Sequence, residues 1–443
     1  MTTAYIPAAA AAADAPPDGK ATPAVLRKVL TASFIGNFVE WFDYASYGYF
    51  ATVIAAVFFP DIAPSAALLA TFGVFAISFV IRPIGGIIWG SIGDRIGRRT
   101  ALSWSILIMS GATTVIALLP SYAQIGMLAP VLLLVVRMVQ GFSASGEYAG
   151  ATSFLAEYAP PSRRGFYTSM VPASTAAGLL AGSLMSALLF SQLTGAQLHG
   201  WGWRLPFLLA FPLGLVGLYI RLKLEDTPRF RELEARHHVE ATPTRELFTT
   251  YRKPILRAFG ATCLNAVGFY LILSYMPTYL ITEMGMDESA SFLANSIALF
   301  AYIFLIFLMG TLSDRLGRKT ALIAASILFI ALTVPLFQML DGAGFWMIVL
   351  IQVIFGALLT VNDGTLPCFL AEVFPTRVRY SGFAFSFNTA NALFGGTAPF
   401  VATWLISVTG SKAAPAWFLV AAAAVALIAM LSSRETAGKP LED

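Results

Sequence analysis

Ionisable side chains occur inside long apolar stretches of this sequence, where charge is costly. Glu40 and Asp43 are three residues apart in one such stretch, so on a helix they share a face. A charged group in an apolar environment is expensive to keep and is therefore a functional candidate by default. We treat six side chains in this way: Glu40, Asp43, Arg82, Arg137, Glu147 and Asp363.

The balance of charge among these six side chains indicates the chemistry they could do. Four are carboxylic acids and two are arginines, so two acids remain if each arginine neutralises one. Burial raises the pKa of a carboxylic acid, and an acid without a counter-charge could take up and release protons near neutral pH. An arginine stays charged, but it can hold a carboxylate through two parallel hydrogen bonds. We expect Arg137 to bind a substrate or to take part in proton coupling.

The roles of the other five side chains stay open from the sequence. Glu147 could carry a proton or form a structural pair with a neighbouring helix. One of Glu40 and Asp43 could bind protons while the other pairs with Arg82. Asp363, which precedes a glycine, could be no more than a polar part of a cavity wall.

Uncharged polar and aromatic side chains in the same stretches are candidates for the wall of a cavity. Amide groups in an apolar environment need partners, which a cavity or a neighbouring helix can provide. Aromatic rings could hold a quaternary ammonium group through cation–π contacts, although helix packing explains most single rings. The candidates are Asn37, Tyr44, Gln140, Tyr270, Asn388 and Asn391.

Long apolar helices must position these residues. The 443 residues are 57% hydrophobic and only 12% charged, with a mean hydropathy of +0.74. A soluble protein needs more surface charge than that. The apolar stretches are about twenty residues long, which is the length that crosses roughly 30 Å of hydrocarbon. We predict membrane-spanning helices at 30–58, 66–89, 102–119, 126–154, 165–189, 203–222, 255–280, 290–310, 321–339, 344–370, 381–408 and 414–432.

Basic residues alternate between the loops that join these helices. Lys and Arg gather in the two tails and in every second loop, which is typical of the cytoplasmic side. Both termini are therefore predicted to be cytoplasmic, and the net charge of +4 reflects topology rather than nucleic-acid binding. The two cysteines and three histidines lack metal-ligand spacing, and no phosphate-binding loop for ATP is present. We expect no metal, no cofactor and no nucleic-acid partner.

A sequence repeat divides the chain into two related halves. The run Gly-x-x-x-Asp-Arg-x-Gly-Arg at 90–98 recurs at 310–318, and Phe-Leu-Ala-Glu at 154–157 recurs at 369–372. Parallel repeats of six helices are typical of transporters that alternate access between two sides. We predict an all-α membrane protein of twelve transmembrane helices in two pseudo-symmetric six-helix bundles. The predicted parts are a disordered tail at 1–29, bundles at 30–222 and 255–432, a central loop at 223–254, and a tail at 433–443.

The repeated loops are also candidate contacts between the two halves. Glycines permit a tight turn and close approach of helices, while the acidic and basic side chains can pair with each other and with helix ends. We expect these residues to change partners with conformation rather than to touch a solute. They are Gly90, Asp94, Arg95, Gly97, Arg98, Gly310, Asp314, Arg315, Gly317, Arg318, Glu157 and Glu372.

With these loops the chain resembles the major facilitator superfamily, in which the same loop follows helix 2. The resemblance implies a twelve-helix fold, and it implies that the loop latches the two halves on the cytoplasmic side in the outward-open state. Further stretches resemble the metabolite:proton symporter branch, which includes proline/betaine, citrate, 2-oxoglutarate, shikimate and phthalate permeases. These stretches are 36–44, 81–86, 137–148, 201–206, 374–382 and 435–440.

The residues and the resemblance lead to one main expectation and one alternative. We expect a monomeric secondary transporter of the bacterial inner membrane that takes up a small carboxylate-bearing solute together with protons. The solute is either an organic acid or a proline- or betaine-like zwitterion. The alternative is a proton-coupled antiporter that exports a drug or a metabolite. No nucleophile–base pair is visible in the sequence, so we do not expect an enzyme.

Overall fold

Helices account for every regular element in the described residues, which are 23–222 and 243–442 of the computed structural model. The first half contains α1 (Pro23–Tyr49), α2 (Ala51–Phe58), α3 (Pro64–Val80), α4 (Arg82–Ile96), α5 (Arg98–Leu118), α6 (Tyr122–Ile125), α7 (Leu128–Ala144), α8 (Glu147–Tyr158), η2 (Pro161–Arg163), α9 (Arg164–Thr168), α10 (Met170–Gln192), α11 (Gly195–Gly200), η3 (Gly202–Arg204) and α12 (Leu205–Leu222). The second half contains α14 (Pro243–Thr250), α15 (Arg252–Gly268), η4 (Phe269–Tyr275), α16 (Met276–Met284), α17 (Glu288–Leu316), α18 (Arg318–Gln338), α19 (Phe345–Asp363), α20 (Leu366–Val373), α21 (Arg379–Ala390), η5 (Asn391–Gly395), α22 (Ala398–Thr409) and α23 (Ala414–Leu431).

These elements form the twelve predicted helices. Eleven helical stretches in the described residues are long and apolar enough to cross a membrane. The remaining long helix is α1, which has 27 residues and carries Asn37, Glu40 and Asp43 along its length. These polar residues make α1 less apolar than the other eleven stretches, so it does not meet the same test of length and hydropathy. The outer faces of the bundle expose large apolar side chains such as Phe304, which suits contact with lipid.

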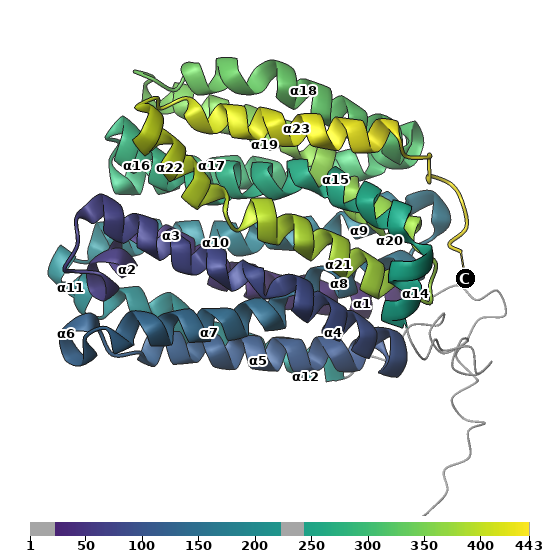
Figure 1. Ribbon diagram of the computed structural model, residues 1–443, viewed down its shortest axis with the longest axis horizontal. Coiled ribbons are helices and arrows are strands. Elements are labelled where there is room, and N and C mark those ends of the chain that lie inside the picture. The colour runs from purple at the N-terminus through teal and green to yellow at the C-terminus, as the bar shows by residue number, and fades with distance from the viewer. Residues whose placement is uncertain (1–22, 223–242, 443) are drawn as a thin grey trace, which may run out of the picture.

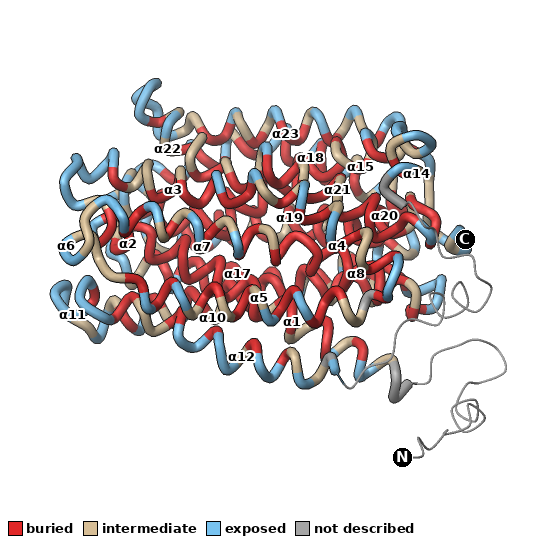
Figure 2. The backbone as a smooth tube through the Cα atoms, turned by 60° about the horizontal axis from the view of Figure 1, so that its bottom comes forward, coloured by how far each residue is buried: buried red, intermediate tan, exposed pale blue. Residues whose placement is uncertain are grey.

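The two halves lie one above the other, as Figure 1 shows, with their helices running in the same general direction. The halves pack together mainly through two helix pairs: α10 packs against α17, and α4 packs against α21. Buried residues fill the middle of the assembly, while exposed residues gather at its two ends and on its outer faces (Figure 2). The residues that matter for function therefore lie where the two halves meet.

Several of the long helices are interrupted near their middle. Proline occupies one of the first two positions of α4, α16, α20 and α22, where its missing N–H costs no helical hydrogen bond. The segments η4 and η5 are π-helical, a geometry that often marks functional sites. Asp363 is the last residue of α19, immediately before such a break. The interruptions place polar side chains at the interface between the halves.

Two predicted boundaries differ from the structure. Helix α1 begins at Pro23, so the end of the predicted tail at 1–29 is helical, and Val29 is buried in an apolar cluster. Part of the predicted central loop at 223–254 forms α14, because the buried Leu247 packs this short helix against the bundle. The rest of these two predictions, at 1–22 and 223–242, lies outside the described residues.

Candidate functional site

Buried charges in the first half form a hydrogen-bonded group between α1 and α7. Asp43 Oδ2 lies 3.4 Å from Nη1 of Arg137, and it accepts a hydrogen bond of 3.0 Å from the amide of Gln140. Gln140 also accepts from Arg137 at 2.8 Å and donates to Thr113. Asp43 and Arg137 are both buried. Nε and Nη2 of Arg137 nevertheless have no hydrogen-bond partner, so this guanidinium retains unused donors.

Aromatic rings cover both buried arginines. The guanidinium of Arg137 lies 4.2 Å from the ring centroid of Tyr47, and that of Arg82 lies 3.9 Å from the centroid of Phe79. Tyr44 lies between them, 4.6 Å from Arg82 and 5.0 Å from Arg137. Arg82 also pairs loosely with Glu40, at 3.9 Å. Cation–π contacts of this kind hold the two charges in place where water is excluded.

Glu147 and Glu40 lie near each other in the first half. Both line a cavity of about 10 Å³ between α1, α5, α7 and α8, which is close to the volume of a single water. Ser105 also lines this cavity, and its hydroxyl donates to Glu147 at 3.4 Å. The structure thus brings two of the predicted acids to one small polar void.

Asp363 is the buried acid of the second half. Its Oδ1 accepts a hydrogen bond of 2.7 Å from the amide of Asn265 on α15, and its Oδ2 lies 2.6 Å from the hydroxyl of Tyr302 on α17. Its side chain has no exposed surface. Among the described residues, no lysine, arginine or histidine lies within ion-pair distance of this carboxylate.

A second cavity of about 10 Å³ lies between the two halves, with room for about one water. Half of its lining residues are aromatic and come from α1, α8, η4 and α21, and two of these rings, Tyr148 and Phe387, stack on each other with centroids 4.5 Å apart. Two polar atoms at this wall, Nε1 of Trp41 and the hydroxyl of Tyr270, are buried without a hydrogen-bond partner. The lining residues are Trp41, Tyr148, Pro172, Thr175, Asn265, Phe269, Tyr270, Asp363, Phe387 and Asn391.

Two of the predicted cavity residues, Tyr270 and Asn391, are on this wall. The other four lie elsewhere. Asn37 ties α1 to α10 by donating to the carbonyl of Val171 and to two hydroxyls, and Asn388 donates across the interface to the carbonyl of Ser145 at 2.6 Å. Gln140 and Tyr44 belong to the group around the buried arginines. Each of these polar groups is satisfied or covered by another helix rather than by a cavity.

The repeated loops meet the opposite half at one end of the molecule, which we call the motif end. Asp94 accepts hydrogen bonds from the backbone N–H and the hydroxyl of Ser381, and Asp314 accepts from the backbone N–H groups at 165 and 166. The repeated glutamates form ion pairs across the interface. Glu157 pairs with Arg379 at 2.7 Å, and Glu372 pairs with Arg164 at 2.9 Å.

Glycines allow the backbones to touch at the motif end. A Cβ on Gly310 would lie 2.8 Å from the carbonyl oxygen of Gly165, and a Cβ on Gly90 would lie 2.7 Å from Cα of Ser381. Gly97 and Gly317 have φ values of 96° and 97°, a region that side chains rarely adopt. Gly90 and Gly310 thus both allow close backbone approach, and Gly97 and Gly317 both adopt the same positive φ.

The basic residues of the two repeated loops differ in how deeply they are buried. Arg318 is buried, and it pairs with Asp314 at 2.7 Å and with Glu372 at 3.3 Å. Arg95 and Arg315 are exposed to solvent, and their predicted change of partners with conformation stays a prediction. Each of these two residues lies in the last turn of its helix. The side chain of Arg98 lies outside the described residues.

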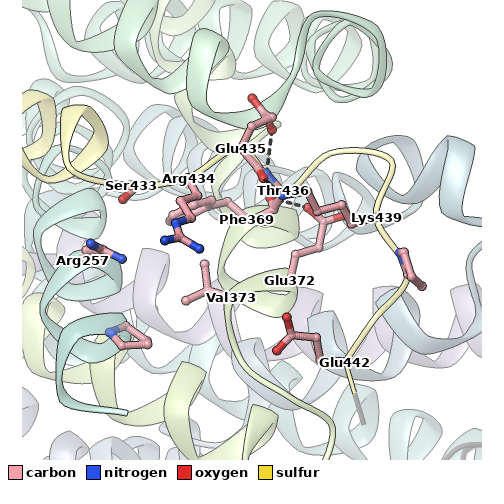
Figure 3. A pocket seen from close by; sticks show the side chains of 12 residues that line it. Arg257, Phe369, Glu372, Val373, Ser433, Arg434, Glu435, Thr436, Lys439 and Glu442 are labelled. Atoms are coloured by element: carbon pink, nitrogen blue, oxygen red, sulfur yellow. Dashed lines mark hydrogen bonds between the residues drawn. The ribbon is translucent and has the colours of Figure 1, made fainter.

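The C-terminal segment crosses the motif end (Figure 3). The hydroxyl of Thr436 donates to Glu372 at 2.7 Å, and Glu435 accepts from the backbone N–H groups at the start of α18. The backbone carbonyl of Glu442 accepts from Arg379. A cavity of about 220 Å³ beside this segment lies away from the buried charges in the membrane-spanning helices, so we do not assign it to the solute.

Neutral hydrogen bonds join the halves near the end opposite the motif end. The hydroxyl of Tyr49 on α1 donates to the carbonyl of Leu273 and accepts from the amide of Asn295. Ser296 donates to Ser183 at 2.9 Å. The cavity between the halves is thus closed by contacts on both sides.

Comparison with known proteins identifies the family. A model described as sugar (and other) transporter matches residues 28–244 and 231–443. The chain belongs to the sugar (and other) transporter family. It is 39% identical to the glycine betaine/proline/ectoine/pipecolic acid transporter OusA of Dickeya dadantii, over 94% of this chain and 85% of that protein. The proline/betaine transporters of Salmonella typhimurium and Escherichia coli are each 37% identical, over 96% of this chain and 86% of theirs.

Solved structures of this family share the fold. The proton:xylose symporter XylE bound to 6-bromo-6-deoxy-D-glucose superposes with a TM-score of 0.79 at 17% identity, over 94% of this chain and 98% of that chain. A partially occluded inward-open XylE from E. coli gives 0.73 at 17% identity, over 94% and 100%. The predicted superfamily and twelve-helix fold are confirmed. The protein is a multi-pass membrane transporter of a small-molecule solute, not an enzyme.

Sequence reasoning did not single out several residues of this site. Tyr148 and Phe387 gave no signal, because aromatic residues are common in packed helices. Tyr302 stands in an apolar helix and is recognisable only through its contact with Asp363. The pairing of Asp94 with Ser381 joins residues 287 positions apart and leaves no local pattern.

Proposed function

We propose that this protein is a proton-coupled symporter that takes up a small zwitterion bearing a carboxylate. The observation that carries the proposal is the cavity between the halves, where aromatic rings, two unpartnered polar atoms and one carboxylate meet. Such a cavity suits a solute with a compact cationic head, because rings attract alkylated ammonium groups through cation–π contacts. The named substrates of the relatives, which include proline and betaine, support the same class.

The buried arginines provide a counter-charge for the carboxylate of such a solute. Phe79 contacts both the guanidinium of Arg82 and the ring of Tyr270 on the cavity wall, so Arg82 is one ring away from the cavity. Arg137 lies beyond it, with two donor atoms unused. A small rearrangement of these rings would bring a substrate carboxylate to a guanidinium. The described residues that line the cavity include aromatic rings and the carboxyl group of Asp363 but no lysine or arginine, so a compact cationic head suits the cavity better than the second carboxylate of a dicarboxylate does.

We infer that transport proceeds by alternate opening of the two ends. The cavity between the halves is too small for a solute and is closed on both sides, so a solute can enter only when the contacts at one end part. The basic loops lie at the motif end, which we assign to the cytoplasm of a bacterial cell. We further propose a functional monomer in the inner membrane, without a cofactor, driven by the proton gradient.

Uptake into reconstituted vesicles tests this function. We expect one of labelled glycine betaine, proline, 2-oxoglutarate, citrate and phthalate to accumulate under an imposed proton gradient, with a zwitterion preferred. A protonophore should abolish the accumulation, and Arg137→Ala should remove it. Accumulation of none of them would contradict the proposal. Extrusion of the solute from preloaded vesicles, in exchange for protons, would favour the exporting antiporter.

A further inference from the structure

The buried carboxylates of the two halves differ in their partners. In the first half Asp43 and Glu40 each face an arginine, at 3.4 Å and 3.9 Å. In the second half Asp363 is held by two neutral groups, the amide of Asn265 and the hydroxyl of Tyr302. An ionised carboxylate in an apolar interior is costly unless it is paired, whereas the neutral acid is not. This site therefore suits a carboxyl group that changes its protonation state.

Among the described residues that surround Asp363, no other group would exchange protons in its place. The titratable groups that face it from neighbouring elements are phenols: Tyr302 of α17, Tyr148 of α8 and Tyr270 of η4. A phenol has an ordinary pKa near 10 and stays protonated near neutral pH. Helix α15 contributes the amide of Asn265, and the described residues of α18 and α20 place no charged side chain in contact with Asp363. Among these described groups, the carboxyl group of Asp363 is the one suited to exchange protons.

We propose that Asp363 carries the coupled proton of this transporter, and that Tyr302 and Asn265 position its carboxyl group on the wall of the cavity between the halves. This inference rests on the proposed function, which it extends by naming the proton site. Asp363 lines the same cavity as the aromatic rings, so the solute and the proton occupy one chamber.

The proton follows a simple cycle at this residue. With the outer end open, a proton from water joins Oδ2 of Asp363 and neutralises the carboxylate. The oxygen of Tyr302, 2.6 Å away, can donate to the carboxylate or accept from the acid, so it serves both forms. The halves close around the solute when the acid is neutral, because the carboxylate of the solute and an ionised Asp363 would repel each other in a dry chamber. With the cytoplasmic end open, the solute and the proton leave to water. The empty carrier then returns with the restored carboxylate held by its hydrogen bonds from Asn265 and Tyr302.

Measuring gradient-driven uptake and solute exchange separately distinguishes a proton-carrying role of Asp363 from a solute-binding role. Uphill uptake requires proton release in every cycle, whereas exchange of labelled for unlabelled solute requires only that the loaded carrier can close and reopen. Asp363→Asn resembles the neutral acid. We expect this variant to lose gradient-driven accumulation, so that the solute only equilibrates, while exchange is retained and no longer falls at high pH. The matched control is Asp341→Asn, an exposed acid outside the helices, which should accumulate solute as the wild type does.

The outcomes of this experiment are distinct. Gradient-driven accumulation by Asp363→Asn would overturn the inference. Loss of exchange in a folded Asp363→Asn, judged by its thermal melting, would also overturn it, because the carboxylate would then bind the solute. Loss of coupling in Glu40→Gln or Glu147→Gln with coupling kept in Asp363→Asn would move the proton to the first half. If the wild type shows no gradient-driven uptake, the proposed function fails instead.

A second variant keeps the inference testable if Asp363→Asn does not fold. Tyr302→Phe removes a donor to the ionised carboxylate and retains the ring and the proton site. We expect this variant to accumulate solute, with the pH midpoint of exchange displaced upward from that of the wild type, because the ionised form loses a hydrogen bond. An unchanged pH profile in Tyr302→Phe would contradict a link between Asp363 and the proton.

Discussion

Charge compensation governs the buried residues of this transporter. Two of its acids are held beside arginines that aromatic rings cover, and one acid in the opposite half is held by neutral donors. The first arrangement keeps charges fixed, while the second permits a change of charge. Unpartnered polar atoms occur on Trp41 and Tyr270 at the cavity between the halves, and on Arg137 within the first half. Buried donors without partners are costly, so their presence is reasonable where a solute supplies the missing acceptor.

Removing one member of the buried pair tests this account at the residue scale. Asp43→Asn leaves Arg137 without its counter-charge in a site that excludes water. Breaking a buried ion pair in this way costs about 3–5 kcal/mol. We therefore expect a lower apparent melting temperature in detergent for Asp43→Asn, and partial recovery in the double variant Asp43→Asn with Arg137→Gln. A melting temperature equal to that of the wild type would show that Asp43 does not compensate Arg137.

Helix contacts at the motif end depend on glycine and on the C-terminal segment. Backbones approach closely where Gly310 meets Gly165 and where Gly90 meets Ser381. The segment after α23 adds backbone carbonyls to the arginines at this end, through the residues at 439 and 442. The interrupted helices allow such contacts to change without unfolding, because their middle turns are already irregular.

Adding a methyl group at one glycine should hold the motif end apart. In Gly310→Ala the new Cβ would lie 2.8 Å from a backbone oxygen, which cannot move aside without its helix. A cysteine that replaces Thr175 on the cavity wall reports this opening. We expect it to react faster with a membrane-impermeant maleimide applied at the motif end when Gly310→Ala is also present than when Gly310 is retained. Gly111→Ala, where a Cβ meets nothing within 4 Å, is the control. Equal labelling rates in the two variants would argue against closure by glycine contact.

The C-terminal segment should detach in acid through a single carboxylate. Burial raises the pKa of Glu435, but four backbone N–H groups that donate to its carboxylate outweigh this effect and hold the pKa below its usual value. The stabilisation is therefore present at neutral pH and is lost as the pH falls through that lowered pKa. A spin label on Leu441→Cys should gain mobility only in that acidic range.

Glu435→Gln should leave the same label mobile at neutral pH, because a neutral amide cannot replace the carboxylate as a strong acceptor of four N–H groups. The matched control is Glu442→Gln, since its backbone carbonyl, rather than its carboxylate, makes the hydrogen bonds to Thr376 and Arg379. Equal label mobility in the wild type and in Glu435→Gln at neutral pH would contradict this role of Glu435.

The sequence predicts the helices of this protein better than it predicts the wall of the cavity. Apolar length predicted twelve helices, and the repeat singled out four acids that contact the opposite half, because both patterns can be read from the sequence. The wall of the cavity was predicted only in part. Asn37 and Asn388 are as polar and as deeply placed as Asn391, yet they bond to neighbouring helices. Which of these amides reaches the cavity depends on how the two halves dock, and nothing local encodes that.

Across the whole molecule the two ends are closed by different kinds of contact. The motif end is held by ion pairs and hydrogen bonds to carboxylates, and the opposite end by neutral hydrogen bonds among the described residues. Hydrogen bonds to charged groups contribute about 1.5–3 kcal/mol each, against about 0.5–1.5 for neutral ones. The opposite end should therefore part more readily, so that the empty carrier opens outward to receive the solute and the proton together.

Proton movement during solute entry tests the central claim most directly. Vesicles that contain the protein and a trapped pH-sensitive dye are given the transported zwitterion at equal internal and external pH. The account predicts that the interior acidifies as the solute enters, with acidification absent in empty vesicles and in Asp363→Asn. Solute entry without any change in internal pH, or with alkalinisation, would contradict proton symport.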